Sequence, residues 1–251
     1  MNRVVATYNI KGGVGKTSAA VNLSYLAAHD GLRTLLWDLD PQGGSTYLFR
    51  IKPKVRGGGN KLVRLKSDVG KLIKGTDHQG LDLLPADFSY RHMDLALDGF
   101  KRPTRRLARV LEPLDGEYDW VFLDCPPSIS LVSESVFEAA DVILVPIVPA
   151  TLSSRTIDQL DAVVSDAREQ GGRAEVLAFF SMVDGRKKLH REVMERLRAD
   201  RTDVLAAVIP ASVEIERMGV ERDAIATFAP AGRAAPAYEA LWRELRARIE
   251  G

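Results

Sequence analysis

The residues with the clearest chemical meaning lie near the start of the chain, in the run Lys11-Gly12-Gly13-Val14-Gly15-Lys16-Thr17. Glycines at this spacing let backbone N–H groups turn inward onto phosphate oxygens, and a following helix adds the positive end of its dipole. Lys16 is placed to reach the β- and γ-phosphates of a nucleotide, and Thr17 to offer its hydroxyl to Mg²⁺. The run therefore predicts a phosphate-binding loop, and a purely structural glycine turn is the weaker interpretation.

Two acidic motifs follow apolar runs further along the chain. Asp38 and Asp40 end the run that begins at Arg33, and Asp124 ends the run Val121-Phe122-Leu123. In an α/β sheet, ligands collect outside the carboxyl ends of the strands, so these carboxylates are well placed to meet one. Three apolar residues before an aspartate are typical of a Walker B strand, whose carboxylate holds Mg²⁺ through water. For Asp40-Pro41, a capped turn is the alternative.

Short apolar runs alternate with helical patterns and supply the frame for these residues. We expect strands at residues 4–8, 33–38, 81–85, 120–123, 142–147, 176–183 and 204–209. We expect helices at residues 19–28, 103–114, 132–140, 153–170, 189–198 and 235–249. Nearly continuous apolar strands alternating with helices predict an α/β fold with a doubly wound, mostly parallel sheet and helices on both faces.

The composition agrees with one domain covering residues 1–251, with a mobile basic loop near residues 52–60. With 45% hydrophobic residues in 251, the chain can bury a large core and is not disordered throughout. Cys125 is the single cysteine, which excludes an intrachain disulfide and favours a reducing, cytoplasmic location. No apolar run approaches the ~20 residues that span a bilayer, and the scattered histidines do not have metal-ligand spacing.

Positive charge gathers in three segments although the net charge is only +1. Residues 50–74 hold nine basic residues against one acid, and smaller clusters lie at 101–109 and 186–191. Lys and Arg contacts to phosphates supply most non-specific DNA affinity, so these segments are candidate DNA contacts. Solvated surface charge is the equal alternative for any one of them.

Three motifs together resemble those of the deviant Walker ATPases of the ParA/MinD family, particularly the Soj-like ParA partition ATPases. The phosphate loop resembles the K-G-G-x-G-K-[ST] form of that family, with Ile10 where an ordinary P-loop has glycine. The acidic motifs resemble its D-x-D-P-Q and D-C-P-P-S strings, and the likeness covers nearly the whole chain. In the family, the early lysine reaches the nucleotide of the partner subunit, so Lys11 implies an ATP-sandwich homodimer.

The resemblance implies ATP and Mg²⁺ as cofactors and assigns roles to particular residues. Lys11, Lys16 and Asp40 are the implied catalytic residues, with Asp40 positioning the attacking water. Thr17, Asp38 and Asp124 are the implied metal site. The implied nucleotide-binding residues are Gly12, Gly13, Val14, Gly15, Lys16, Thr17, Ser18, Met182 and Pro210, the last two lining the adenine.

The same resemblance implies a cytoplasmic ATPase that positions DNA or another cargo, with the nucleoid as a candidate site of association. Its slow hydrolysis is expected to be stimulated by a ParB-like or cargo-adaptor partner. The family's arginines after Ile209-Pro210 are missing, and Glu214 at one of these positions is expected to repel DNA phosphates. The alternatives are a MinD-like membrane-surface switch, which would use the amphipathic tail at residues 238–249 and is not favoured, and a metabolic ATP-dependent enzyme on the same fold.

Overall fold

A single sheet organises the chain. The computed structural model describes residues 2–169 and 171–251. Among these residues, eight strands form the order β3-β4-β2-β5-β1-β6-β7-β8, parallel throughout except that the edge strand β3 runs antiparallel to β4. The strands are β1 (Arg3–Thr7), β2 (Thr34–Asp38), β3 (Lys74–Gly75), β4 (Leu81–Leu84), β5 (Trp120–Asp124), β6 (Val142–Ile147), β7 (Glu175–Val183) and β8 (Val204–Pro210).

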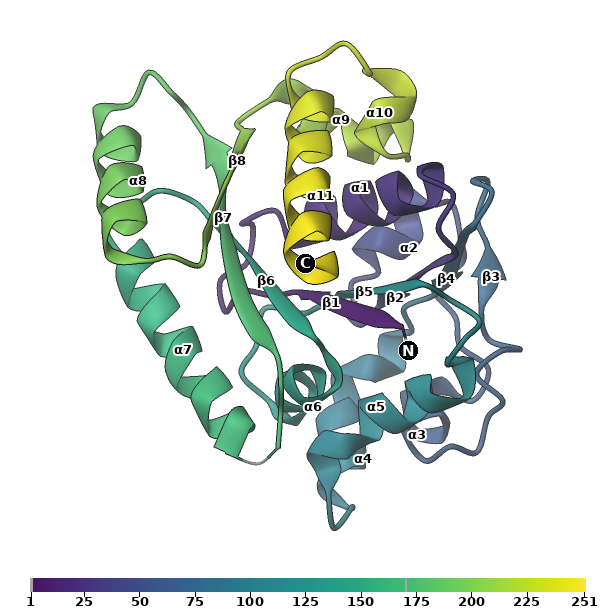
Figure 1. The fold of residues 1–251 in the computed structure, drawn as a ribbon. Helices are drawn as coiled ribbons and strands as arrows, with labels where there is room; N and C mark the ends of the chain where they lie inside the picture. Colours follow the sequence, from purple (N-terminus) through teal and green to yellow (C-terminus); the bar gives the residue numbers. More distant parts are fainter. Residues whose placement is uncertain (1, 170) are drawn as a thin grey trace.

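Helices cover both faces of the sheet, as Figure 1 shows. The helices α1, α2, α9, α10 and α11 lie over one face, and α3 to α8 over the other. The α-helices are α1 (Lys16–His29), α2 (Gly44–Leu48), α3 (Gly58–Val63), α4 (Met93–Asp98), α5 (Arg106–Leu111), α6 (Leu131–Ala139), α7 (Ser153–Glu169), α8 (Lys188–Asp200), α9 (Val213–Glu221), α10 (Ile225–Phe228) and α11 (Ala234–Glu250). Short 3₁₀ helices lie at Phe88–His92, Pro103–Arg105 and Glu112–Leu114.

The central strands are apolar on both sides because both sides are covered. Val5 of β1 packs under α1 and α11, while its neighbour Ala6 packs toward α6 and α7. In β5 every residue is buried, including Asp124 at its end. Continuous burial of this kind is the signature of a parallel sheet between two helical layers. The predicted fold class is therefore confirmed, and each predicted strand is found with its ends shifted by no more than about two residues.

The sequence did not predict the short helices or one edge strand. Helices α2, α3, α4, α9 and α10 and strand β3 had no predicted counterpart. The helix expected at residues 103–114 is instead α5 between two 3₁₀ helices, and Pro113 has no N–H to continue the α-helical hydrogen bonds past Leu111. The predicted helix at 153–170 matches α7, and position 170 lies outside the described residues.

The segment predicted as a mobile loop near residues 52–60 is anchored on the protein surface. Val55 is buried, and its backbone N–H donates to Asp87 Oδ2 at 2.8 Å. Gly58 begins α3, which packs against α4 and α5. The basic residues of the segment are therefore presented by an ordered turn and a short helix.

Helix α11 buries its apolar face inside the protein. Leu241, Trp242 and Leu245 pack with α1 and the sheet, and Trp242 lies edge-on to Trp120 with ring centroids 4.8 Å apart. The Trp242 Nε1–H donates to Asp30 Oδ2 at 2.9 Å. The apolar side chains that a membrane switch would insert into a bilayer are thus packed inside the protein. Within the described residues, no helix is long and apolar enough to cross a bilayer.

This packing predicts the cost of trimming α11. Leu241→Ala should lower the free energy of unfolding by about 2–5 kcal/mol, because it empties a fully buried site in the layer under α11. Leu95→Ala is the matched control, since that side chain is 78% exposed and its loss should cost no more than about 0.5 kcal/mol. Urea unfolding followed by circular dichroism measures both, and equal costs would contradict the burial of α11.

Candidate functional site

The phosphate loop connects β1 to α1 and has the strained geometry that its glycines allow. Gly15 has a φ of 96°, and a Cβ at that position would lie 2.8 Å from the Ser181 hydroxyl oxygen. Only glycine therefore fits this turn. The buried Lys16 ammonium donates to the Lys11 carbonyl at 2.9 Å, across the mouth of the loop. Its burial lowers the pKa of Lys16, and the nearby Asp124 opposes that change.

Two carboxylates lie buried beside this loop, at the ends of neighbouring strands. Asp38 and Asp124 are directly paired across β2 and β5, and both are fully buried. Burial raises the pKa of Asp38, and the charge of Asp124 raises it further. Burial also raises the pKa of Asp124, against the lowering effect of the Ser45 hydrogen bond and of the neighbouring Thr17 hydroxyl. Two carboxyl groups this close disfavour ionisation of one another in a site without water. Hydrogen-bond donors around them are therefore needed to stabilise any negative charge.

Those donors come mainly from α2, the short helix that the sequence reading missed. Thr46 gives Asp38 Oδ2 two hydrogen bonds, from its hydroxyl at 2.7 Å and from its backbone N–H at 2.8 Å. Ser45 Oγ donates to Asp124 Oδ2 at 2.6 Å. Gly44 sits so close to Thr17 that a Cβ would lie 3.0 Å from the Thr17 methyl. Helix α2 therefore contacts the phosphate-loop threonine and both buried acids.

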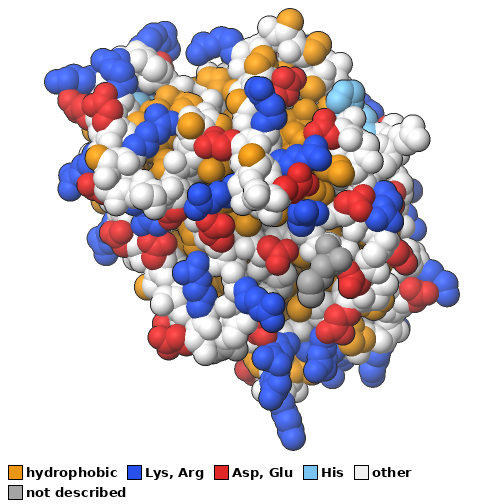
Figure 2. All heavy atoms as spheres, in the orientation of Figure 1, with side chains coloured by type: hydrophobic (Ala, Val, Ile, Leu, Met, Phe, Trp, Pro, Cys, Tyr) orange, Lys and Arg blue, Asp and Glu red, His pale blue; other side chains and the backbone are white. Residues whose placement is uncertain are grey.

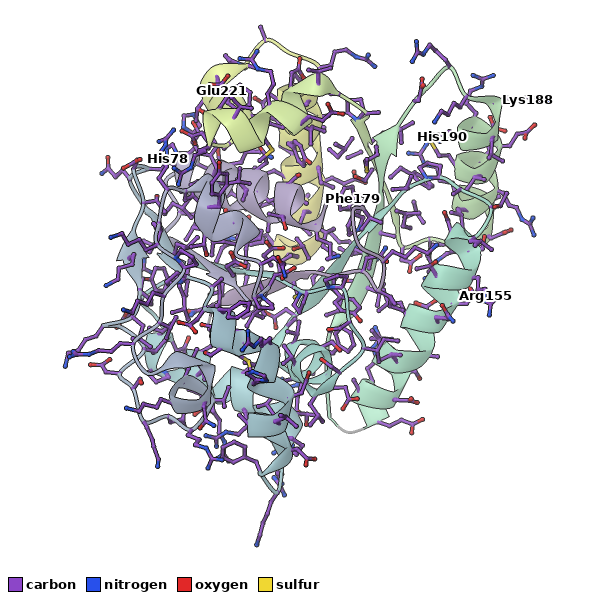
Figure 3. All side chains as sticks on the ribbon, turned by 180° about the vertical axis from the view of Figure 1, so that it is seen from behind. His78, Arg155, Phe179, Lys188, His190 and Glu221 are labelled. Atoms are coloured by element: carbon purple, nitrogen blue, oxygen red, sulfur yellow. The ribbon has the colours of Figure 1, made fainter. Side chains whose placement is uncertain are left out.

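The far end of α2 is fastened to α9. The Tyr47 hydroxyl donates to the Gly219 carbonyl at 3.2 Å, and Arg222 Nε donates to the Tyr47 carbonyl at 3.0 Å. Arg50 donates to the Glu221 carbonyl at 3.0 Å. Arg50 and Arg222 both adopt positive φ, which costs energy in residues with a side chain and persists only under such restraint. Figure 3 shows Glu221 and the nearby His78 on this side of the molecule.

A hollow of about 330 Å³ opens beside the loop and brings most of the predicted site residues together. Its wall includes Asp40, which is half-buried, and Met182, whose φ of 55° is unusual for a residue with a side chain. The lining residues are Gly12, Gly13, Gly15, Lys16, Thr17, Ser18, Asp40, Pro127, Ser181, Met182, Ile215 and Tyr238. Strain at a residue that faces a hollow is a recognised mark of a binding site.

Two predicted nucleotide contacts lie outside this lining. Pro210 ends β8 and pairs with Val183, and the buried Val14 side chain faces a smaller hollow beside Lys11. Ser181 and Ile215 line the hollow beside the phosphate loop but were not predicted from the sequence. Ile215 stands five residues after Pro210, so the Ile209-Pro210 motif marked the right region while α9 supplies the side chain.

Lys11 projects from the rim of the site. Its backbone N–H donates to Asn9 Oδ1 at 2.9 Å, and Asn9 is anchored by donation to the Pro146 carbonyl at 2.8 Å. The residue is exposed, and within the described residues its ammonium forms no ion pair. The loop therefore presents one buried lysine, Lys16, and one lysine directed to solvent.

The residues around Asp124 fit a bound Mg²⁺ with phosphate. Asp124 Oδ1 is buried with no hydrogen-bond partner, which is a costly state unless a ligand or water completes it. The Thr17 hydroxyl adjoins the same carboxylate. Within residues 2–169 and 171–251, no three His, Cys, Asp or Glu side chains form a metal cage of their own. This is the expected form of a Mg²⁺ site, which keeps waters and shares its ion with phosphates.

Asp38 has a different environment from Asp124. Its Oδ2 accepts both bonds from Thr46, and its Oδ1 accepts the backbone N–H of Asp40 at 3.2 Å. Asp38 thereby fixes the start of the loop that carries Asp40. Its role as a metal ligand stays a prediction.

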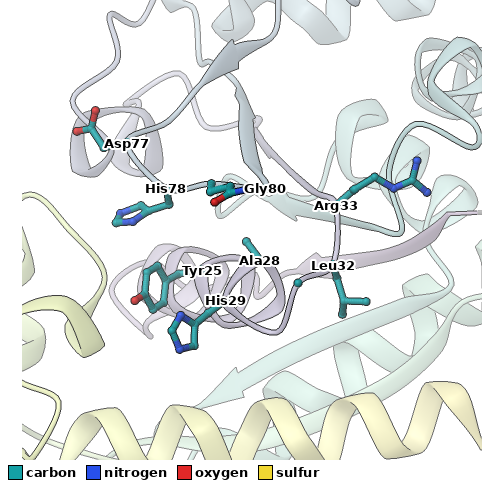
Figure 4. Close-up of a pocket in the computed structure, with 10 residues that line it drawn as sticks. Tyr25, Ala28, His29, Leu32, Arg33, Asp77, His78 and Gly80 are labelled. Carbon is teal, nitrogen blue, oxygen red and sulfur yellow. The ribbon is translucent and has the colours of Figure 1, made fainter.

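A larger hollow than the one beside the phosphate loop lies at the opposite edge of the sheet. Its volume is about 690 Å³, and it lies where α1 ends and where β2 and β4 begin. Figure 4 shows Tyr25 and His29 side by side on α1, with His78 nearby. His78 is already bonded to Asp223 at 2.8 Å and packs edge-on against Tyr25. These contacts tie the turn before β4 to α1 and to the start of α10, and none of the predicted site residues lies here.

The predicted basic segments separate into two surfaces. Helix α3 packs against α5, so residues 50–74 and 101–109 share one flank, where Figure 2 shows Lys and Arg side chains gathered below α4 and α5. Arg50 and Arg106 do not belong to it, since Arg50 bonds to Asp77 and Arg106 is buried and donates to the Val63 carbonyl. Exposed members are Arg56, Lys61, Arg64, Lys66, Lys101, Arg102 and Arg109. Residues 186–191 lie across the molecule, near Lys188 in Figure 3.

Glu214 has backbone and side-chain partners that the sequence did not predict, and its effect on DNA stays a prediction. Its carboxylate accepts the backbone N–H groups of Arg233 and Ala234, at 3.2 and 2.9 Å, at the start of α11. The Ser212 hydroxyl donates to it at 2.9 Å. These bonds lower the pKa of Glu214 and direct its charge toward the positive end of α11. Only contacts with a segment far along the chain could reveal this role.

Comparison with known proteins agrees with this geometry. A family model described as an AAA domain matches residues 2–176. The sporulation initiation inhibitor protein Soj of Bacillus subtilis is 30% identical over 98% of this chain and 99% of its own length. The chromosome-partitioning ATPase Soj of Thermus thermophilus is 33% identical over 99% of this chain and 97% of its own.

Solved structures share the architecture. A cobyrinic acid a,c-diamide synthase from Mycobacterium smegmatis, with a bound ATP analogue and magnesium, has a TM-score of 0.88 and 26% identity, covering 100% of this chain and 96% of that chain. Apo McdA from Cyanothece has a TM-score of 0.85 at 18% identity, covering 98% of this chain and 100% of that chain, and shows the fold alone.

The buried acids predict a pH dependence of stability. Because the pKa of Asp38 is raised in the folded protein, that carboxyl keeps its proton above pH ~4, where an unfolded aspartate loses it. Folding then binds the proton, so this contribution to stability is complete below pH ~4 and is lost as the pH rises, by up to about 1.4 kcal/mol per pH unit.

Asp38→Asn cannot ionise, so its stability relative to wild type should increase from pH 5 to pH 8.5. Urea unfolding in EDTA measures this difference. Asp77→Asn, at an exposed carboxylate, is the control and should show a nearly constant difference. A constant difference for Asp38→Asn would mean that Asp38 is ionised when folded.

Proposed function

Because the chain belongs to the ParA/MinD family of ATPases, we propose that it is a ParA-type positioning ATPase that switches between states with bound nucleotide. ATP and Mg²⁺ bind in the hollow beside the phosphate loop, and hydrolysis gives ADP and phosphate. The observation that carries this proposal is the convergence of Lys16, Thr17 and Asp40 on one hollow, with the buried Asp124 carboxylate next to Lys16 and Thr17. A relative named as a chromosome-partitioning ATPase matches over nearly the full chain.

The side chains divide the work of phosphoryl transfer, in which positioning and charge neutralisation lower most of the barrier. When bound, Mg²⁺–ATP supplies the reacting phosphoryl group and a cation that offsets its charge. Lys16 exchanges its bond to the Lys11 carbonyl for phosphate oxygens. Thr17 and Asp124 hold the metal side of the site, and Asp40 orients the attacking water from the rim. Met182 and Ile215 contact the base.

ATP favours a homodimer in which each Lys11 reaches the partner's phosphates. The unpaired, solvent-directed ammonium of Lys11 supports this, because its own loop offers it no anion. Exposed apolar residues also lie at this edge: Ile129 follows β5 and Leu152 follows β6, at 53% and 58% exposure. Since parallel strands end at the same edge, these side chains share it with the phosphate loop and suit the face of a second copy.

The ATP-bound dimer binds a surface and releases it after hydrolysis. The flank formed by α3 and α5, with the basic residues of segments 50–74 and 101–109, suits DNA phosphates. The ionised Glu214 carboxylate is bonded to the start of α11 and is not part of this flank. A ParB-like or cargo-adaptor protein stimulates hydrolysis. The setting is cytoplasmic, with the nucleoid as the platform when DNA is bound.

Metabolic chemistry on the same fold is the second candidate, since one similar structure is named as a synthase. It would need a second substrate beside the nucleotide. The relative named as a chromosome-partitioning ATPase is 33% identical over 99% of this chain, which favours the positioning ATPase.

Dimer formation tests the role of Lys11. In an Asp40→Ala background, which should hold ATP without turnover, Lys11→Ala should bind ATP with an affinity within about threefold but should lose the ATP-dependent dimer in light scattering. Lys74→Ala, on the far edge strand β3, is the control and should dimerise normally. If the ATP-dependent dimer persists in the Lys11→Ala variant, Lys11 does not contact the partner's nucleotide.

Salt dependence tests the basic flank. ATP-bound Asp40→Ala protein should bind DNA, and adding Lys61→Ala and Lys66→Ala should make the slope of log affinity against log salt shallower by about two. Arg243→Ala with Arg248→Ala, exposed on α11, should leave the slope unchanged. If the flank variant and the α11 variant behave alike, DNA does not bind at α3 and α5.

A further inference from the structure

Ser45 is fully buried in α2, and its hydroxyl contacts Asp124, a residue of the proposed Mg²⁺ site. Ser45 Oγ donates to Asp124 Oδ2 at 2.6 Å, within the usual range of about 2.5–2.7 Å for a hydroxyl bonded to a carboxylate. We propose that Ser45 is a positioning residue for Mg²⁺, which orients the Asp124 carboxylate so that its other oxygen faces the metal site. This inference rests on the proposed nucleotide and Mg²⁺ site.

The state of the two Asp124 oxygens supports this role. Oδ2 is held by Ser45, whereas Oδ1 is buried and has no hydrogen-bond partner. A carboxylate without the Ser45 bond could rotate about its last side-chain torsion, which is broad and roughly two-fold. With the bond, one oxygen is committed to α2 and the other remains to accept a Mg²⁺-bound water.

Ser45 can direct Asp124 because α2 itself cannot shift freely. Gly44 lies against the Thr17 side chain, so the helix start is fitted to the phosphate loop. Thr46 bonds Asp38 and also accepts the Ala86 backbone N–H at 2.9 Å. The hydroxyl of Ser45 is therefore held between two fixed neighbours. Partners that orient a metal ligand in this way typically change metal affinity by about 10–100-fold when removed.

The test measures Mg²⁺ dependence separately from nucleotide binding. The fluorescent nucleotide N-methylanthraniloyl-ADP is bound to each variant in EDTA and then across a MgCl₂ series. Ser45→Ala should raise the MgCl₂ concentration for half-maximal effect by about 10-fold or more. Its affinity for the nucleotide in EDTA should stay within about twofold of wild type.

Ser24→Ala is the matched control. Ser24 is equally buried, but its hydroxyl donates to the Val21 carbonyl of its own helix, at 3.1 Å. This variant should leave both measurements unchanged. Ser45→Cys keeps the side chain small with a weaker donor, so it should give an intermediate shift and serves if Ser45→Ala does not fold.

Two results would overturn the inference. One is a MgCl₂ dependence in Ser45→Ala and Ser45→Cys that equals that of wild type. The other is an equal loss of nucleotide affinity with and without MgCl₂, which would make Ser45 only a packing residue. Failure of the wild-type protein to bind the nucleotide under any condition would instead contradict the proposed function.

Discussion

The structure depends on keeping two carboxylates buried side by side at the carboxyl edge of the sheet. Asp38 and Asp124 are paired residues on β2 and β5, and neither is exposed to solvent. Like charges in a dry site raise each other's pKa values, so the arrangement survives only with well-placed donors and a cation nearby. Thr46, Ser45 and Thr17 supply the donors. The buried Lys16 ammonium supplies the nearby positive charge.

Helix α2 contacts the buried acids and also connects them to a distant part of the chain. One end contacts Thr17 and both acids, and the other is bonded to the last turn of α9. Helix α9 in turn contributes Ile215 to the hollow. The phosphate-loop threonine and the two buried acids are thus connected to Ile215 through α2 and α9. The switch that we propose would use this connection between the two sides of the hollow.

The motifs and the central sheet were predictable because their signals are local. The phosphate loop and the apolar runs ending in Asp38 and Asp124 are short patterns with a strong physical cause, and the structure places them where the strands end. Helix α2 was not predictable in the same way. It has only five residues, begins after Gly43 in a left-handed conformation, and is stabilised by bonds to Asp38 and Asp124 rather than by its own propensity. The contacts of Glu214 were not predictable for the same reason, since its backbone partners lie about twenty residues further along the chain.

Nucleotide binding by wild type and Lys16→Ala is the measurement that tests the central claim most directly. Isothermal titration with ATP, with and without MgCl₂, reports whether the phosphate loop and the buried acids form one site. The account predicts that wild type binds ATP more tightly with MgCl₂ and that Lys16→Ala loses at least about 100-fold in affinity, by removing a buried charge-assisted contact to phosphate. Unchanged ATP affinity in a folded Lys16→Ala protein would contradict it.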